Sequence, residues 1–512
     1  MIGKTYRSRI KNSRRNIVAG LVKQAVIILS NFVLRTVIIH SLGAEYQGIS
    51  GLFTSILQVL NLTDLGLASA VTFILYKPVS ENDTASINAI LSFLKKIYRI
   101  IGLIILIAGL AIAPFLPNLI HGEYPADINI YTLFGMYIIN AVSSYWLFSY
   151  KSTFLTAVQR VDLVSNIYTI VHIVIKLLQI LLLILLKDYY VYTALIPIGN
   201  IANNVVLELI SRRAFPEIYA NGTIDQVTKK TLYKQVKAVF INRLGDIARN
   251  SFDNIIISSF FGLIAVAAYD NYYYVYSALY GVMGIIIHSL WASIGNSIVT
   301  ESTQKNYNDL LCFSFIFMWI VGFCTVCMFV LYQPFMNLWM KDKPELILPF
   351  FDMSLFCVYF YSISMTYTKN VYLESKGLFH ESRYLYIFEA VGNLALNIFL
   401  GKVLGLTGIL LATIFTILVF NFWGGTRILF KYYFKDGEKK FLFYHVCYAL
   451  ITISVCIVMN FISNAISVDG ISGLLIRAVL CIAITNVIYF AIYSRIPQFN
   501  EAKKAIRTML KR

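Results

Sequence analysis

The residues best suited to chemistry lie between Phe240 and Ile257, where charged side chains interrupt a stretch that is otherwise apolar and long enough to span a membrane. At about 100° of rotation per residue in a helix, the polar residues share an arc of ~140°: Asn242, Arg243, Asp246, Arg249, Asn250, Asp253 and Asn254. Ionisable groups at membrane depth are costly, and they usually face a protein interior or a water-filled cavity. The pattern therefore predicts a functional polar face on this helix.

The acids on this face do not fully compensate its two arginines. Arg249 has Asp246 and Asp253 at helical spacings, whereas Arg243 has only Asp246 nearby. One interpretation is an internal string of ion pairs. The other is that Arg243 and Arg249 bind phosphate, which guanidinium groups hold in a bidentate fork. Asp246 and Asp253 then hold the arginines when the site is empty, or serve in coupling or gating.

The first apolar run, 16–41, also carries a polar face that includes Lys23 and Arg35. We expect both cations to line a cavity, although each is close enough to one end of the run to snorkel to the membrane surface. Asp64, at the end of the second run, is a candidate coupling-ion site or a structural partner of Lys23 or of a residue of the seventh span.

A third polar face lies on the fifth apolar run, where His172, Lys176 and Gln179 follow the spacing i, i+4, i+7. This spacing places Lys176 near the middle of the bilayer, where snorkelling is hardest. The alternative is a hydrogen-bond cluster that only holds helices together. His172 is also a candidate protonation switch for coupling or gating.

Composition restricts the class of protein that these faces belong to. The 512 residues are 58% hydrophobic and only 13% charged, against about 25% charged in ordinary globular proteins, and the mean hydropathy is +0.70. We therefore expect an all-α, polytopic membrane protein that does not bind nucleic acid. Apolar runs of about 20 residues predict fourteen spans, near 16–41, 47–75, 97–120, 128–149, 161–186, 190–211, 239–262, 264–299, 309–333, 346–372, 382–401, 407–428, 443–464 and 471–494.

The basic residues predict the orientation of these spans. The net charge of +17 includes a basic leader, 1–15, that precedes an apolar run too long for a signal-peptide core. The alternate loops that would lie outside hold few basic residues: Lys187, Lys341, Lys343 and Lys402. By the positive-inside rule, both termini lie in the cytoplasm, and the basic inner loops attract anionic membrane lipids.

Internal similarity predicts two lobes. APFLPNLI at 113–120 recurs as QPFMNLWM at 333–340, and Leu42-Gly43 recurs as Phe261-Gly262 at nearly the same offset. Two six-helix halves of parallel topology follow from this repeat. The expected organisation is a leader at 1–15, an N-lobe at 16–213, a cytoplasmic linker at 214–238, a C-lobe at 239–431, two further helices at 443–496 and a basic tail at 497–512.

The chain shows no set of residues typical of an enzyme or a metal centre. Cys324 and Cys327 form a CxxC, but no second pair or nearby histidine completes a metal set. No outer loop is long, and none holds a pair of acids or a glycine-rich phosphate loop. We therefore expect a protein that is not an enzyme, with its functional groups inside the membrane.

These features together resemble the multidrug/oligosaccharidyl-lipid/polysaccharide (MOP) exporter superfamily. The resemblance rests on LGAEYQGISGLFTSILQVLNLTDLGLASAV at 42–71, the Pro-Phe exits of the third and ninth spans, the 6+6+2 arrangement and the basic first helix of each lobe. Within the superfamily, the chain is most similar to Wzx-type flippases of polysaccharide repeat units.

The resemblance implies a MATE-like, V-shaped pair of lobes that work by alternating access in the bacterial cytoplasmic membrane. It implies as substrate an undecaprenyl-diphosphate-linked oligosaccharide bound for capsule, exopolysaccharide or O-antigen, with polysaccharide polymerase machinery as a partner. It also implies that cavity cations receive the diphosphate and sugars, and the positions that fit are Lys23, Arg35, Lys176, Arg243 and Arg249. Coupling to H⁺ or Na⁺ stays open.

Two other functions remain as alternatives. A cation-coupled multidrug exporter of the same superfamily would be expected to have an acid-dominated cavity, whereas bases exceed acids on the first, fifth and seventh spans. A membrane glycosyltransferase or polymerase belongs to a different class, and it would lengthen glycans rather than move them.

Overall fold

The computed structural model describes residues 6–61 and 67–510, although the side chains of some helical residues, chiefly 234–250, fall outside the description. Within the described residues the chain is helical and contains no strand. Eleven of the described segments are long and apolar enough to cross a membrane. The chain is therefore an all-α, multi-pass membrane protein, as predicted.

Twelve of the fourteen predicted spans lie on these eleven segments, and the other two lie on shorter helices. The second predicted span corresponds to α2 and α3, between which residues 62–66 are not described. The fourth corresponds to α5, which ends at Trp146 and is shorter than the other spans. The seventh and eighth share the single helix α9. The difference in number thus reflects how the helices are divided and not a missing part of the fold.

Contacts divide the chain into two compact units, one ending at Ala267 and the other beginning at Ala268. By this division, the first part of α9 belongs to the first unit, which therefore extends past the predicted linker 214–238. The predicted assignment of residues 239–431 to a second six-helix lobe stays a prediction.

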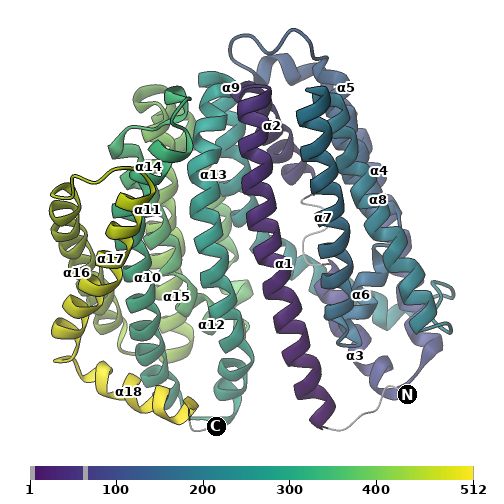
Figure 1. The fold of residues 1–512 in the computed structure, drawn as a ribbon. Helices are drawn as coiled ribbons and strands as arrows, with labels where there is room; N and C mark the ends of the chain where they lie inside the picture. Colours follow the sequence, from purple (N-terminus) through teal and green to yellow (C-terminus); the bar gives the residue numbers. More distant parts are fainter. Residues whose placement is uncertain (1–5, 62–66, 511–512) are drawn as a thin grey trace. The chain divides into compact units, whose positions relative to one another are not determined.

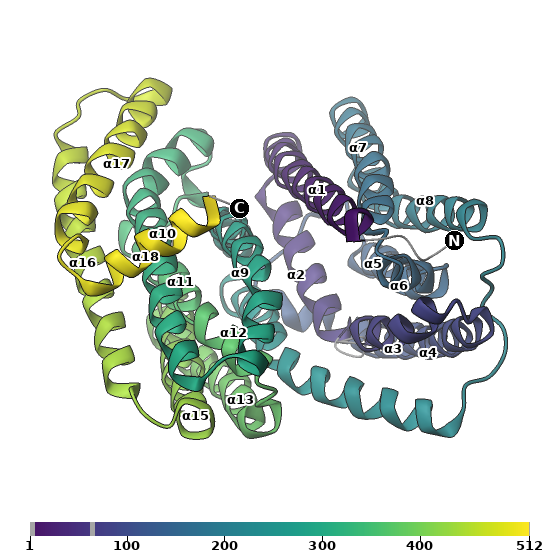
Figure 2. The ribbon, with the colours of Figure 1, turned by 90° about the horizontal axis from the view of Figure 1, so that it is seen from below.

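The helices of the first unit are shown in purple to teal in Figure 1. They are α1 (Tyr6–Ser41), α2 (Ala44–Leu60), α3 (Leu67–Glu81), α4 (Thr84–Ile112), the 3₁₀ helix η2 (Ala113–Leu119), α5 (Ile130–Trp146), α6 (Tyr150–Ala157), α7 (Val161–Leu186), α8 (Tyr189–Ala214) and the first part of α9 (Gln226–Thr300). The helix α1 packs along α7, and the two lie side by side in both views (Figures 1 and 2). Three further pairs also pack together: α4 with α5, α5 with α8, and α7 with α8.

Side-chain caps fix where several of these helices begin. Asn129 accepts hydrogen bonds from the backbone N–H groups of Tyr131 and Thr132 at the start of α5. Asp188 accepts from Tyr190 and Val191 at the start of α8. Each cap satisfies backbone donors that have no partner within the first helical turn, and such caps typically contribute about 1 kcal/mol.

Glycines permit a close approach within the first unit. Gly43 has φ +136°, and Gly262 interrupts the helical geometry of α9 with φ +81°. A Cβ on Gly48 would lie 2.1 Å from the carbonyl oxygen of Leu263, so only glycine lets α2 approach α9 this closely. Gly43 and Gly262 are the two glycines matched by the internal repeat, and both adopt a positive φ.

The second unit holds the remaining helices, coloured green to yellow in Figure 1. They are the end of α9, α10 (Thr303–Trp339), η3 (Pro344–Leu346), α11 (Phe350–Ser364), α12 (Tyr367–Ser375), α13 (Phe379–Leu404), α14 (Leu406–Thr416), the π-helical η4 (Ile417–Gly424), α15 (Gly425–Leu429), η5 (Phe430–Phe434), α16 (Glu438–Asn464), α17 (Gly470–Tyr493) and α18 (Pro497–Leu510). The helices α16 and α17, predicted as additions to the lobes, both pack on α10. The short helix α18 also contacts α10 and runs across the end of this unit (Figure 1).

Candidate functional site

The packing of α1 on α7 brings two of the predicted polar faces together. The Nζ atom of Lys23 lies 4.3 Å from the centroid of the Tyr168 ring. Tyr168 in turn stacks on His172, with 5.2 Å between ring centroids. The Nε2 atom of His172 is 2.9 Å from the Oγ atom of Ser30. The first and fifth spans therefore share one polar seam, which we call the α1–α7 seam.

Two lysines of the α1–α7 seam have no acidic partner among the described residues. Among the described residues, neither Lys23 nor Lys176 forms an ion pair, and both lie close enough to His172 to act on it electrostatically. Lys23 and Lys176 are each half-buried. A half-buried ammonium without a counter-ion is costly, and an anion bound beside it offsets that cost.

Two arginines form ion pairs at the end of the seam where α7 begins. Arg15 of α1 forms an ion pair with the buried Asp162, at 3.0 Å between Nε and Oδ2. Arg160 also contacts Asp162, at 3.1 Å. In the other direction along α7, Gln179 is buried and donates to the carbonyl oxygen of Tyr192 at 3.1 Å. Gln179 therefore forms a structural contact between α7 and α8.

Arg35 lies further along α1 and is half-buried. It is close enough to the buried Tyr192 of α8 to interact with it electrostatically. The structure thus places Lys23, Arg35, His172 and Lys176 along α1 and α7 of a single unit. Their roles in binding or coupling stay predictions, and the hydrogen bond between Ser30 and His172 is also the contact that the helix-packing alternative requires.

The charged centre of the predicted face on α9 lies outside the described residues. The side chains of Arg243, Asp246 and Arg249 are not described, and neither is Asp64. Asp253 is described, and it is only 2% exposed.

Two neighbours of Asp253 connect α9 to α2. Ser251 donates to Oε1 of Gln58 at 3.1 Å, and Asn254 donates to Oγ of Ser55 at 3.1 Å. This end of the polar face therefore packs against α2 within the first unit.

Gln58 also lines a polar cavity of ≈ 240 Å³ between α2, α5 and α8. Its wall consists of Ser50, Thr54, Leu57, Gln58, Asn61, Tyr137, Asn140, Ala141, Ser144 and Ile196. The hydroxyl of Tyr137 donates to Ser50 at 3.0 Å, and Asn200 bonds to Asn140 beside the cavity. These uncharged groups suit a ligand rich in hydroxyl groups. We did not predict this cavity, although the amide of Asn140 inside an apolar run was a signal for it.

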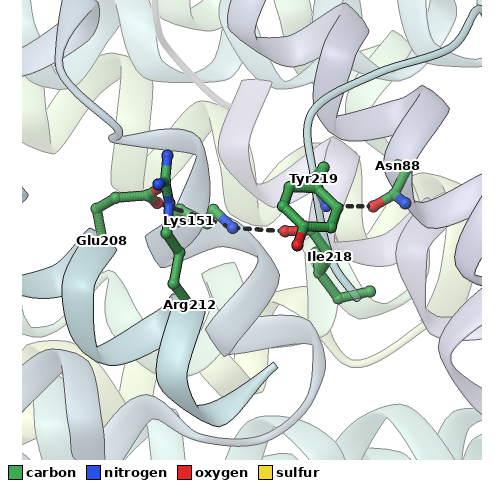
Figure 3. A network of polar contacts seen from close by, with 6 residues as sticks. All are labelled: Asn88, Lys151, Glu208, Arg212, Ile218 and Tyr219. Carbon is green, nitrogen blue, oxygen red and sulfur yellow. Dashed lines mark hydrogen bonds and ion pairs between the residues drawn. The ribbon is translucent and has the colours of Figure 1, made fainter. Parts of the chain in front are cut away.

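A second unpredicted feature is the buried lysine of α6, drawn in Figure 3. Lys151 is 2% exposed, and its Nζ atom donates to the carbonyl oxygen of Ile218 at 2.8 Å. The same ammonium lies 3.7 Å from the carboxylate of Glu208, which also bonds to Arg212 at 2.5 Å. Lys151 thereby fixes the start of the linker that follows α8, and we call this arrangement the Lys151 clamp.

The linker is fixed at one further point. Asn88 of α4 donates to the carbonyl oxygen of Glu217 at 3.2 Å. It also accepts from the backbone N–H of Tyr219 at 2.8 Å, and Figure 3 shows this second bond. Because these bonds involve the linker backbone, they do not depend on the linker's side chains.

Comparison with known proteins finds solved structures that share this fold. No family model and no curated protein matches the chain. Among solved structures, the chain is similar to the lipid II flippase MurJ in an inward closed conformation, with a TM-score of 0.65 and 15% identity over 93% of this chain and 98% of that one.

Two further similar structures are described as transporters of the MOP superfamily. One is an inward-facing multidrug resistance MATE family transporter, with a TM-score of 0.62 and 14% identity over 81% of this chain and 98% of that one. The other comes from Pyrococcus furiosus and is described as having a binding pocket of reversed polarity, with a TM-score of 0.57 and 14% identity over 83% of this chain and 97% of that one. The chain therefore has the fold of the MOP exporters, which confirms the resemblance at the level of the fold.

Proposed function

We propose that this protein is a flippase that moves undecaprenyl-diphosphate-linked oligosaccharide repeat units from the cytoplasmic to the outer leaflet of the bacterial cytoplasmic membrane by alternating access. The observation that carries the proposal is the pair of lysines, Lys23 and Lys176, which lie in one seam and have no neutralising acid in the part of the chain that the structure describes. A diphosphate supplies the missing negative charge, and ammonium groups bind phosphate well. Arg35, Arg243 and Arg249 extend this set of cations in the proposal.

The polar cavity between α2, α5 and α8 supports a glycan as the other part of the substrate. Asn140 and Gln58 present amides, and Ser50 and Thr54 present hydroxyls, without any formal charge in the wall. Groups of this kind exchange hydrogen bonds with sugar hydroxyls at little desolvation cost. The similar MurJ structure is described as a lipid II flippase, which supports a lipid-linked substrate.

The alternative within the same fold is a cation-coupled multidrug exporter, which the MATE structures favour. A cavity for cationic drugs needs acids, and the acid described along the α1–α7 seam, Asp162, is already paired with Arg15 and Arg160. The charge of the seam thus favours an anionic substrate.

The proposal includes the orientation and the partners. Both termini face the cytoplasm, the exported glycan passes to polysaccharide polymerase machinery, and Asp64, Asp246, Asp253 and His172 are the candidates for H⁺ or Na⁺ coupling or for gating.

The test is to reconstitute the purified protein in liposomes with a fluorescent undecaprenyl-diphosphate oligosaccharide and to measure how fast the label becomes accessible on the opposite side. We expect the wild type to accelerate this transfer and Arg249→Ala to abolish it, with Arg249→Lys retaining part of the rate. An unchanged rate for a folded Arg249→Ala variant contradicts the role of that arginine. Longer glycans in the same reaction establish a polymerase and displace transport.

A further inference from the structure

The polar cavity between α2, α5 and α8 combines three kinds of surface. Its volume is ≈ 240 Å³, and sites for whole drug-sized ligands occupy about 300–1,000 Å³, so the cavity suits one part of a glycan. Beside the hydroxyl and amide groups, its wall contains the apolar side chains of Leu57, Ala141 and Ile196. A matching ligand group therefore has a hydrogen-bond acceptor, a donor and a small apolar end.

The hydrogen bonds beside the cavity determine how the amide of Asn140 is oriented. The Nδ2 atom of Asn200 donates to the backbone carbonyl oxygen of Asn140 at 3.0 Å, and a carbonyl oxygen only accepts. This bond fixes the amide of Asn200, whose Nδ2 atom also donates to Oδ1 of Asn140 at 3.2 Å. Because Oδ1 is the acceptor in that bond, Nδ2 of Asn140 is left as a donor.

The donor of Asn140 is accessible to a ligand. Asn140 is half-buried and lines the cavity. Among the described residues its Nδ2 atom has no acceptor, and it does not belong to the buried side-chain atoms that lack a partner. The atom therefore keeps accessible surface, and a carbonyl oxygen of a ligand can accept its hydrogen bond.

An acceptor lies one helical turn further along α5. The hydroxyl of Ser144 donates to the carbonyl oxygen of Ala141 at 2.6 Å. Its proton is used in this bond, so Oγ of Ser144 offers its lone pairs to a ligand. Ser144 is half-buried and lines the cavity, and residues four apart lie on the same face of a helix. The wall thus presents a donor and an acceptor side by side.

We propose that this cavity binds the acetamido group of an N-acetylated amino sugar in the transported glycan, an inference that rests on the proposed function. The carbonyl oxygen of the acetamido group accepts from Nδ2 of Asn140, and its N–H donates to Oγ of Ser144. Its methyl group packs against Leu57 and Ile196. A sugar hydroxyl at the same position has no methyl group, and a uronic acid carboxylate has no N–H for Ser144.

The test uses two synthetic lipids, undecaprenyl-diphosphate-N-acetylglucosamine and undecaprenyl-diphosphate-glucose, which differ only in an acetamido group or a hydroxyl group at one carbon. The dissociation constant of each lipid is measured for the purified full-length protein in nanodiscs. We expect the wild type to bind the acetamido lipid at least ~10-fold more tightly, because a lipid without the acetamido group leaves the polar groups of the wall unpaired.

Substitutions in the wall assign this preference to its residues. Asn140→Leu should remove the preference, since the affinity for the acetamido lipid falls to that for the glucose lipid, and Ser144→Ala should reduce it. The matched control is Asn203→Leu, because Asn203 is a half-buried amide of α8 that bonds to Asn204 and is not part of the described wall. This variant should keep the preference. A thermal melt checks that each variant is folded.

A third lipid tests the apolar part of the wall without any substitution. The N-formyl analogue of the acetamido lipid lacks only the methyl group. We expect the wild type to bind it about tenfold more weakly, as is typical for one group of this size in an apolar pocket. Because the protein is unchanged, this comparison does not depend on the folding of a variant.

Three results would overturn the inference, and they are distinguishable from failure of the proposed function. They are equal affinity of the wild type for the acetamido and glucose lipids, equal affinity for the acetamido and N-formyl lipids, and a preference that persists in a folded Asn140→Leu variant. If both lipids are still flipped in liposomes, the proposed function stands. A wild type that neither binds nor flips any of these lipids contradicts the proposed function and this inference with it.

Discussion

The ammonium group of Lys23 lies over the ring of Tyr168, 4.3 Å from its centroid, and this contact joins α1 to α7 without neutralising the charge. A cation–π contact of this kind contributes about 0.5–2 kcal/mol. The ring holds the ammonium in place while leaving it available to an anion, which an ion pair with a carboxylate would not do.

Lys176 provides the sharpest test of the seam. We expect Lys176→Gln to lower flipping of the fluorescent glycolipid at least ~10-fold, equivalent to ~1.4 kcal/mol, and Lys176→Arg to keep most of the rate. The melting temperature of Lys176→Gln should stay equal or rise, because removing an unpaired ammonium relieves its desolvation. Lys187→Gln is the control, since Lys187 is an exposed cation at the end of the same helix. A lower melting temperature with unchanged flipping would instead make Lys176 a structural residue.

Gly48 tests the close approach of α2 to α9. An added methyl group lies 2.1 Å from the backbone oxygen of Leu263, and overpacking of this kind costs about 1–3 kcal/mol. We expect Gly48→Ala to lower the melting temperature of the detergent-solubilised protein. Gly20→Ala on α1 meets no atom within 4 Å, so it should be neutral or stabilising through its better helix propensity. Equal effects of the two substitutions would show that the contact does not constrain the fold.

The Lys151 clamp tests the attachment of the linker. Lys151→Met removes a buried ammonium from Glu208 and from the carbonyl oxygen of Ile218, and breaking a buried pair costs about 3–5 kcal/mol. We expect the low end of this range, because Arg212 still neutralises Glu208. The measurement is unfolding in detergent, with the exposed Lys96→Met as control, and limited proteolysis within 214–238 should become faster. A wild-type proteolysis rate would contradict the clamp.

The hydroxyl of Tyr46 makes the stability of the folded state depend on pH. Its hydroxyl donates to both carboxylate oxygens of Asp127 at 2.6 and 2.7 Å, between the first two predicted spans. Burial and then Asp127 raise the pKa of Tyr46 above its usual value. The folded state thus holds this proton more tightly, so the stabilisation is complete below the unfolded pKa of about 10 and is lost as the pH rises above it.

We therefore expect the melting temperature of the wild type to exceed that of Tyr46→Phe at pH 8, and the difference to shrink above pH ~10. A difference that is constant across this range would show that the bond to Asp127 does not control the titration of Tyr46.

The sequence was enough to predict the fold class, because hydropathy and length dominate the structure of a membrane helix. The predicted boundary between the spans 239–262 and 264–299 coincides with the break in α9 at Gly262. The meeting of Lys23 with Tyr168 was not predictable, because it depends on how α1 rotates against α7, and periodicity on one helix does not identify the partner helix. The same reasoning accounts for the polar cavity, whose residues come from α2, α5 and α8.

The Lys151 clamp went unpredicted for a different reason. Its acceptor is the backbone carbonyl of Ile218. Every residue has a backbone carbonyl, so the residue types along the chain do not show which one accepts the bond. Sequence patterns identify which side chains carry charge, whereas this interaction is decided by where the main chain of the linker passes.

The position of that carbonyl also sets an order of assembly. Ile218 follows α1 to α8 in the chain, so the ammonium of Lys151 acquires this partner only after all eight helices have been synthesised. Until then a buried cation of α6 lacks one of its hydrogen bonds. The clamp can therefore close only after α1 to α8 have been made, but before the part of α9 that completes the first unit, which runs to Ala267.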